Sequence, residues 1–280
     1  GITRGGSLPF LNKMQQAELK EWVDQTLPAS SHSIGAFIKE TFGVVYEARS
    51  GLIKLLNRIG LTHHKPHVIP RDLNDDKQEA FIKEYNELMN GLDPDEMVVF
   101  ADAVHPTHAV RPSGCWASKE ITLAVEQTSG RKRLNIHGAI DLETGQTRML
   151  DVPTVNAQST IALLKSLEFH NPNKRIIHVF LDNARYHHAA IVKEWLAQKG
   201  RRVQLHFIPT YCPHLDPIER LWALMYKDVT HNKSYVKFNE FCANILTFLR
   251  HDVPEKWHTF CDSVSDNFRI ISKQNVRVLT

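Results

Sequence analysis

The sequence lacks any apolar run of the ~18 residues that a membrane-spanning helix needs. Its first ten residues also lack the continuous apolar stretch of a signal peptide. No C-x-x-C pair occurs, which disfavours a zinc or disulfide framework and favours reduced thiols in an intracellular protein. Four cysteines are present: Cys115, Cys212, Cys242 and Cys261. With no internal repeats or low-complexity tracts either, the 280 residues are expected to form one large domain, or one medium domain and a small one.

The composition is that of an ordinary globular protein, with 42% hydrophobic and 23% charged residues. The net charge of +3 is unevenly placed. Residues 1–72 hold nine Lys and Arg against six Asp and Glu, so they carry the whole excess, and residues 73–280 are neutral. A basic N-terminal part in front of a neutral body fits contact with nucleic acid, although a solvated surface explains it equally well.

Apolar periodicity predicts three helices in the N-terminal part, over 13–26, from near Ser33 to Gly43, and over about 46–59. Two helices joined by a short turn form a helix-turn-helix pattern, in which the third would be the recognition helix. That helix would offer Arg49, Lys54 and Arg58 to DNA. A small helical bundle without a DNA role fits the pattern as well. We take residues 1–62 as this segment and residues 63–92 as a linker followed by a helix over about 77–91.

From residue 96 the sequence predicts an α/β domain over 93–280. Strands are expected over 97–104, 132–141, 146–153, 175–183 and 202–209, and helices over 156–169, 188–199, about 216–229, 237–250 and 256–273. The first three strands can form an antiparallel meander, whereas strands that alternate with helices should be parallel. The predicted fold is a mixed five-stranded sheet flanked by helices.

Three carboxylates are candidates for chemistry in this domain. Asp102 interrupts an apolar strand, where a buried charge costs several kcal/mol unless it is compensated. Asp182 ends another apolar strand, and ligands gather at the carboxyl ends of strands in open α/β sheets. Glu219 lies in the first turn of the helix that follows the 210–217 loop and can point to the same edge. Taken singly, an Asp at a strand end is more often a cap or a turn residue.

Three carboxylates in one pocket repel one another, and divalent cations with a preference for oxygen ligands, Mg²⁺ or Mn²⁺, relieve that repulsion. Two ions about 3.5–4 Å apart can clamp a phosphodiester for attack by water or by a DNA 3′-hydroxyl. The sequence therefore predicts a two-metal site for phosphodiester chemistry. Several basic residues are candidates for contact with DNA phosphates beside it, with a solvated charged hairpin as the alternative: Arg111, Lys119, Arg131, Lys132 and Arg133.

Three segments carry a resemblance to a known family: FADAVHP (100–106), LDNARYHH (181–188) and YCPHLDPIERLW (211–222). They resemble the motifs around the three catalytic carboxylates of the DDE transposases, specifically the IS630 branch of the IS630/Tc1/mariner superfamily. RLNIHGAID (133–141) is similar to the family's second strand, and residues 34–66 are similar to its second helix-turn-helix unit. Thirty-six residues separate Asp182 from Glu219, close to the spacing of the superfamily.

The resemblance implies an RNase H-like fold in which Asp102, Asp182 and Glu219 hold two Mg²⁺ or Mn²⁺ ions. Asn183 and His187 would orient a carboxylate or contact the scissile phosphate. The implied activity is cleavage of transposon ends and strand transfer into target DNA, with TA as the target dinucleotide. The implied partners are double-stranded DNA, as terminal inverted repeats and as target, and a second copy of the chain in a homodimer. The implied location is the bacterial cytoplasm, in association with the nucleoid.

The sequence departs from the family pattern in three ways. Cys212 replaces a Ser, and Asp216 replaces an Asn and adds a fourth carboxylate. Family members also begin with a further helix-turn-helix unit, for which this sequence leaves no room, so we expect weaker recognition of transposon ends. Two alternatives stay open: a structure-specific nuclease of the same fold that cuts without joining, and a decayed or domesticated copy that only binds DNA.

Overall fold

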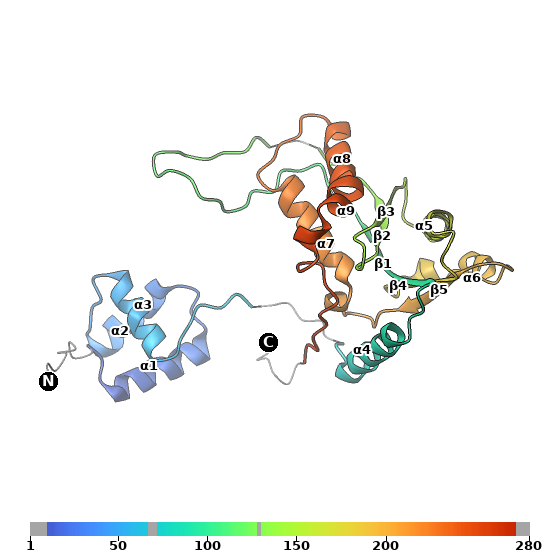
Figure 1. The fold of residues 1–280 in the computed structure, drawn as a ribbon. Coiled ribbons are helices and arrows are strands. Elements are labelled where there is room, and N and C mark those ends of the chain that lie inside the picture. The colour runs from blue at the N-terminus through green and yellow to red at the C-terminus, as the bar shows by residue number, and fades with distance from the viewer. Residues whose placement is uncertain (1–9, 67–71, 128–129, 273–280) are drawn as a thin grey trace, which may run out of the picture. The chain divides into compact units, whose positions relative to one another are not determined.

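The computed structural model describes residues 10–66, 72–127 and 130–272 (Figure 1). The chain divides into two compact units, Gly1–Val68 and Ile69–Thr280, which we describe separately. Among the described residues, no helix has both the length and the apolar character needed to cross a membrane. The expected linker over 1–12 and the one over 63–76 lie partly outside the described residues.

The first unit is a bundle of three helices, α1 (Lys13–Thr26), α2 (Ser31–Phe42) and α3 (Arg49–Arg58). Asn12 caps α1 by accepting a hydrogen bond from the Gln15 N–H, and α2 ends at Gly43, whose φ of 69° favours glycine. The core consists of Leu11, which precedes α1, and of apolar side chains from all three helices: Leu19, Ile34, Ile38, Leu52, Leu55 and Leu56. The three helices predicted from periodicity are confirmed.

The second unit is built on a five-stranded sheet in the order β3-β2-β1-β4-β5. The strands are β1 (Glu96–Val104), β2 (Ile136–Ile140), β3 (Thr147–Asp151), β4 (Ile176–Leu181) and β5 (Val203–Phe207). β1, β2 and β3 pair antiparallel, and β4 pairs parallel with both β1 and β5. The predicted meander followed by parallel strands is therefore confirmed, as is the mixed five-stranded sheet.

Helices cover both faces of this sheet. The longer ones are α4 (Asp75–Asn90), α5 (Ala157–His170), α6 (Ala190–Leu196), α7 (Pro217–Met225) and α8 (Phe238–Thr247). Shorter turns are η1 (Arg185–His188), η2 (Pro213–Leu215), the π-helical η3 (Tyr226–Thr230) and η4 (Phe248–Asp252), α9 (Val253–Glu255) and α10 (Trp257–Phe260). Val99 and Val179 face the core that α5 and α6 cover, whereas Phe100 and Phe180 face the core of α4, α7 and α8. Strand alternation thus assigns each residue to one of two buried layers.

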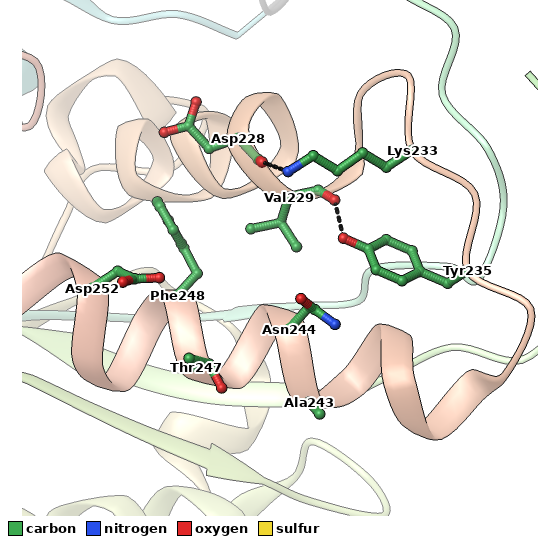
Figure 2. A pocket seen from close by; sticks show the side chains of 9 residues that line it. All are labelled: Asp228, Val229, Lys233, Tyr235, Ala243, Asn244, Thr247, Phe248 and Asp252. Carbon is green, nitrogen blue, oxygen red and sulfur yellow. Dashed lines mark hydrogen bonds between the residues drawn. The ribbon is translucent and has the colours of Figure 1, made fainter.

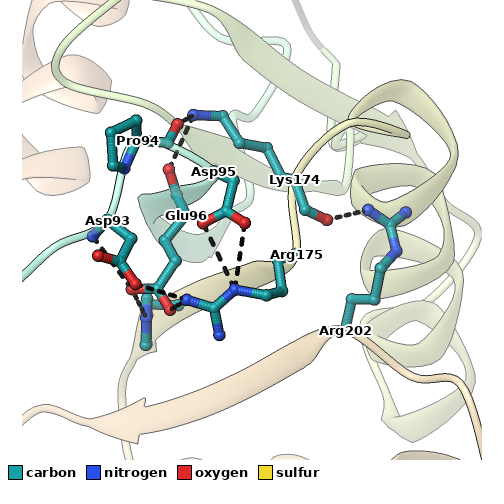
Figure 3. A network of polar contacts seen from close by, with 8 residues as sticks. Asp93, Pro94, Asp95, Glu96, Lys174, Arg175 and Arg202 are labelled. Carbon is teal, nitrogen blue, oxygen red and sulfur yellow. Dashed lines mark hydrogen bonds and ion pairs between the residues drawn. The ribbon is translucent and has the colours of Figure 1, made fainter.

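Ion pairs join β1 and β4 where both strands begin (Figure 3). The guanidinium of Arg175 lies 2.7 Å from a carboxylate oxygen of Asp93, 2.7 Å from one of Glu96 and 3.2 Å from one of Asp95. The Arg175 side chain is 51% exposed, so these pairs add little free energy of folding. Because they span the two strands, they favour the register that pairs Glu96 with Ile176.

The predicted helix over 256–273 is wrong. Only α10 is helical there, and the chain beyond it runs without regular structure to residue 272. The side-chain amide of Gln78 donates to the Ile271 carbonyl and accepts from the Ile271 N–H, both at 3.0 Å. Phe268 packs on Phe81 and Tyr85 of α4. These contacts with a helix almost 200 residues away hold the segment extended, which its local sequence does not reveal.

Candidate active site

The sheet places Asp102 and Asp182 side by side. Ala101 of β1 is paired with Leu181 of β4, so both aspartates follow one residue later on neighbouring parallel strands. Both also continue the alternation of Phe100 and Phe180, and so lie on the face that α7 covers. The two acidic residues predicted to meet at the carboxyl ends of these strands do so.

Glu219 reaches the same place from α7. Asp216 caps this helix by accepting the Ile218 N–H at 3.2 Å, and Pro217 occupies its first turn. Asp102, Asp182, Asp216 and Glu219 all line one cavity of about 350 Å³ at the edge of the sheet. Its remaining wall is formed by Asn183 and Ala184, which follow β4, and by residues 208–213, which follow β5.

Asp102 is held by the helix that carries Glu219. The indole Nε1 of Trp222 donates to Oδ2 of Asp102 at 2.9 Å, and Trp222 is 3% exposed. Gly138, the β2 partner of Asp102, leaves space for this ring, because a Cβ there would lie 3.1 Å from the Trp222 Cη2. Burial raises the pKa of Asp102, and the Asp182 carboxylate adds to the rise, while the Trp222 hydrogen bond opposes it.

Asp182 is held differently. Its Oδ1 accepts the Ala184 N–H at 3.0 Å and lies 3.4 Å from Nε2 of His187. The hydrogen bond with His187 lowers the pKa of Asp182, although partial burial opposes this effect. At neutral pH Asp182 is therefore an ionised carboxylate that faces the cavity.

The other two carboxylates have raised pKa values. Burial raises the pKa of Glu219 to about 7, with the charges of Asp102 and Asp182 adding to the rise. Asp216 is 4% exposed, and burial and the Asp102 charge raise its pKa well above the ordinary value. Negative charges lie close together here, and a bound cation would relieve their repulsion.

The chemical type of these side chains fits a hard divalent cation. All four present carboxylate oxygens, which are the ligands that Mg²⁺ and Mn²⁺ take. The carboxylates surround the cavity without converging on a point. Within the described ranges, no three His, Cys, Asp or Glu side chains stand close enough together to hold a metal ion.

The two further candidates beside the carboxylates differ in their surroundings. His187 is 3% exposed and faces Asp182. The side-chain Nδ2 of Asn183 donates to the Ile208 carbonyl at 2.6 Å, and its Oδ1 lies 3.3 Å from Nε2 of His188. Asn183 thus ties the end of β4 to the end of β5.

The basic residues expected to contact DNA are mostly exposed. Arg49, Lys54 and Arg58 lie on the solvent side of α3, and Lys119, Arg131, Lys132 and Arg133 are exposed in the long connection between β1 and β2. Arg111 is different, because its guanidinium stacks on the Tyr226 ring with 3.8 Å to the centroid. This contact fastens the start of the connection to the turn after α7.

Sequence reasoning missed three features of the site. It did not connect Trp222 with Asp102, 120 residues away. It also missed His137, which is 1% exposed on β2 with its ring centroid 5.8 Å from that of His187. Tyr211 lines the cavity and is 58% exposed. Its backbone φ is 63°, an angle that residues other than glycine rarely adopt. A non-glycine residue in this conformation shows itself only in three dimensions.

A second cavity, of about 240 Å³, lies between η3 and α8 (Figure 2). Lys233 and Tyr235 line it, and their polar ends donate to the backbone carbonyls of Asp228 and Val229. These side chains fasten the loop after η3. The cavity contains two carboxylates, Asp228 and Asp252, against four at the sheet edge, so the sheet edge is the better candidate for chemistry.

Comparison with known proteins gives two family matches, to the DDE superfamily endonucleases over residues 97–242 and to the winged helix-turn-helix family over residues 30–85. Among solved structures, the Mos1 transposase paired-end complex with left transposon end is 17% identical, with a TM-score of 0.59. The Mos1 mariner paired-end complex with Mn is 18% identical, also with a TM-score of 0.59. Each comparison covers 96% of this chain and 83% of the other. At this identity the likeness shows a shared fold. The curated proteins gave no match.

Proposed function

Because the chain belongs to the DDE superfamily endonucleases, we propose that it is a DNA transposase that cuts transposon ends and joins them to target DNA. The observation that carries this proposal is the single cavity that Asp102, Asp182 and Glu219 line at the carboxyl edge of the sheet. The family match supports the DDE assignment that the three sequence motifs indicate. The RNase H-like fold, shared with the Mos1 transposase, is consistent with it.

In this proposal Asp102, Asp182 and Glu219 hold two divalent cations, Mg²⁺ or Mn²⁺. Bound there, such ions supply activation of the attacking oxygen and stabilisation of the leaving oxygen of a phosphodiester. The same residues serve cleavage, with water as the nucleophile, and strand transfer, with a DNA 3′-hydroxyl. Similar structures of the Mos1 mariner paired-end complex were determined with Mn and with Mg, which supports the choice of metal.

The chain's own side chains prepare the carboxylates for this work. Trp222 fixes one oxygen of Asp102, and the Ala184 N–H together with His187 fixes one oxygen of Asp182. Asp216 caps α7 and so orients the helix that carries Glu219. Holding the carboxylates before DNA arrives reduces the reorganisation needed in the reaction.

We assign DNA contact to two basic groups. Arg49, Lys54 and Arg58 are exposed on α3, the second helix of a helix-turn-helix pair within the winged helix-turn-helix match. A second group, on the connection between β1 and β2, would contact phosphates near the carboxylates: Lys119, Arg131, Lys132 and Arg133. Arg111 is engaged with Tyr226, so we assign it the task of holding this connection in place.

Two finer points belong to the proposal. Joining two transposon ends requires two active sites, so we propose a homodimer, in keeping with the paired-end complexes of the Mos1 transposase. The target is proposed to be a TA dinucleotide, and the location the bacterial nucleoid, both from the resemblance to the IS630 branch.

The proposal is tested with double-stranded DNA that carries the inverted repeats flanking the coding sequence. The intact chain should nick this DNA in Mg²⁺ and not in EDTA, and Asp182→Asn should abolish nicking while the chain stays folded. A second assay offers pre-cut ends and a supercoiled target. Joined product supports a transposase, cutting without joining supports a structure-specific nuclease, and binding without cutting supports a decayed or domesticated DNA-binding protein.

A further inference from the structure

At its start, α5 carries two adjacent hydroxyls that each contact a buried histidine. Oγ of Ser159 lies 3.0 Å from Nδ1 of His137, and Oγ1 of Thr160 lies 3.2 Å from Nδ1 of His187. The two histidines come from β2 and from η1, so α5 joins elements that are far apart in sequence. Of the two histidines, His187 is the one that faces a carboxylate of the cavity.

A continuous chain of contacts runs from Thr160 to Asp182. The Thr160 hydroxyl donates to the Asn156 carbonyl at 3.1 Å, and its oxygen lies 3.2 Å from Nδ1 of His187. The opposite ring nitrogen, Nε2, lies 3.4 Å from Oδ1 of Asp182. Thr160 and His187 are 2% and 3% exposed, whereas the Asp182 side chain is 55% exposed. The carboxylate is thus at the surface of the cavity and its support is buried behind it.

The hydroxyl has a specific effect on the histidine ring. The terminal torsion of a histidine is broad, so the ring plane is poorly fixed by the side chain's own preferences. A hydrogen bond at one ring nitrogen fixes both the plane of the ring and the direction in which the other nitrogen points. Removing the Thr160 hydroxyl would leave Nδ1 of His187 without this partner, and Nε2 would lose its fixed aim at Asp182.

We propose that Thr160 is a positioning residue of the cleavage site, which acts through the His187 ring to set the orientation in which Asp182 meets a divalent cation. The inference rests on the proposed function, because it presumes that Asp182 is a metal ligand. Thr160 lies outside the three sequence motifs that indicate the family, and only the fold brings it to the site.

The test compares variants that differ by one hydroxyl. Thr160→Val keeps the shape of the side chain and removes the hydroxyl, Thr160→Ala removes it with less bulk, and Thr160→Ser keeps it. Thr147→Val is the matched control, because the Thr147 hydroxyl is also buried, donates to the Leu249 carbonyl at 2.6 Å and is absent from the cavity wall. Circular dichroism first establishes that each variant is folded.

The main readout is Mn²⁺ binding to the full chain without DNA, measured by isothermal titration calorimetry. Thr160→Val and Thr160→Ala should weaken Mn²⁺ binding roughly 10-fold, because the loss of a side chain that supports a metal ligand typically has an effect of this size. Thr160→Ser and Thr147→Val should bind as the unaltered chain does. The Mg²⁺ concentration that gives half-maximal nicking should rise in the same two variants, which a purely structural loss of active protein would not produce.

A double-mutant cycle tests whether Thr160 acts through His187. In a His187→Gln background, Thr160→Val should weaken Mn²⁺ binding no further, because the chain of contacts from Thr160 to Asp182 is already broken. Full additivity, or Mn²⁺ binding by Thr160→Val equal to that of the unaltered chain, would overturn the role of Thr160 and leave the transposase proposal intact. If the unaltered chain neither binds Mn²⁺ nor nicks end DNA, the proposed function fails and this inference falls with it.

Discussion

The hydrogen bond from Trp222 to Asp102 is open to a direct test by Trp222→Phe. A hydrogen bond to a charged group contributes about 1.5–3 kcal/mol. The phenyl ring is smaller than the indole by ~40 Å³, which at about 24 cal/mol per Å³ of cavity adds roughly 1 kcal/mol. We therefore expect the free energy of unfolding of the second unit to fall by about 2.5–4 kcal/mol.

Trp195→Phe is the matched control. Trp195 is 4% exposed in the core on the other face of the sheet, and its buried Nε1 has no hydrogen-bond partner among the residues that the structure describes. The same loss of volume occurs there, but the change also removes an unpaired buried donor, which relieves about 1–3 kcal/mol. The net cost of Trp195→Phe should be close to zero or favourable.

Both variants are unfolded in guanidinium chloride, followed by circular dichroism and fitted with separate transitions for the two units. Unchanged slopes with a shifted midpoint identify a change in stability. Nicking of end DNA at limiting Mg²⁺ should fall roughly 10-fold for Trp222→Phe and stay unchanged for Trp195→Phe, since only the former releases Asp102, a proposed metal ligand. Equal unfolding costs for the two variants, or full nicking by Trp222→Phe, would refute the anchoring role.

Three other changes have defined outcomes. Gly138→Ala should cost about 1–3 kcal/mol in urea unfolding and reduce nicking, because its Cβ would meet the Met149 sulfur at 2.4 Å and crowd Trp222; stability equal to the unaltered chain would contradict this. Burial, aided by the His187 charge, lowers the pKa of His137 to about 3 from 6.5. His137 therefore leaves the free energy of unfolding unaffected above pH 6.5, where it is neutral in both states. Below pH 6.5 only the unfolded chain takes up the proton, so the free energy of unfolding falls towards pH 3 at about 1.4 kcal/mol per pH unit. His137→Gln should flatten that part of the stability profile, and an unchanged profile would exclude this origin. Lys54→Ala should reduce the salt dependence of DNA binding, measured by fluorescence anisotropy, by about one unit of slope, whereas an equal loss in an α1 control, Lys20→Ala, would count against a recognition role for α3.

The sequence predicted the sheet well because the signals for it are local. Each strand is an apolar run. The positions of Asp102 near the end of β1 and of Asp182 directly after β4 follow from those runs together with the rule that parallel strands share an edge. Glu219 followed from its place just after Pro217, at a helix start. The helix-turn-helix unit was predictable for the same reason, since Gly43 and the apolar periodicity mark the helix boundaries.

The support of the carboxylates could not be predicted, because it depends on contacts between distant segments. Trp222 and Asp102 are 120 residues apart, and Thr160 and His187 are 27 apart. The C-terminal segment was wrongly predicted as helix for the same reason, since Gln78 holds it extended. Periodicity describes what a segment buries, and it does not identify the partner of a polar side chain.

The helix α7 combines two of these contributions in one element. Glu219 and Trp222 are three residues apart, a separation that places two side chains on the same face of a helix. Through Trp222 the helix fixes an oxygen of Asp102, and through Glu219 it brings the third carboxylate to the cavity that Asp102 lines. A shift or rotation of α7 would therefore displace Glu219 and release Asp102 together. The spacing of Glu and Trp in this segment thus couples the first carboxylate of the site to the third.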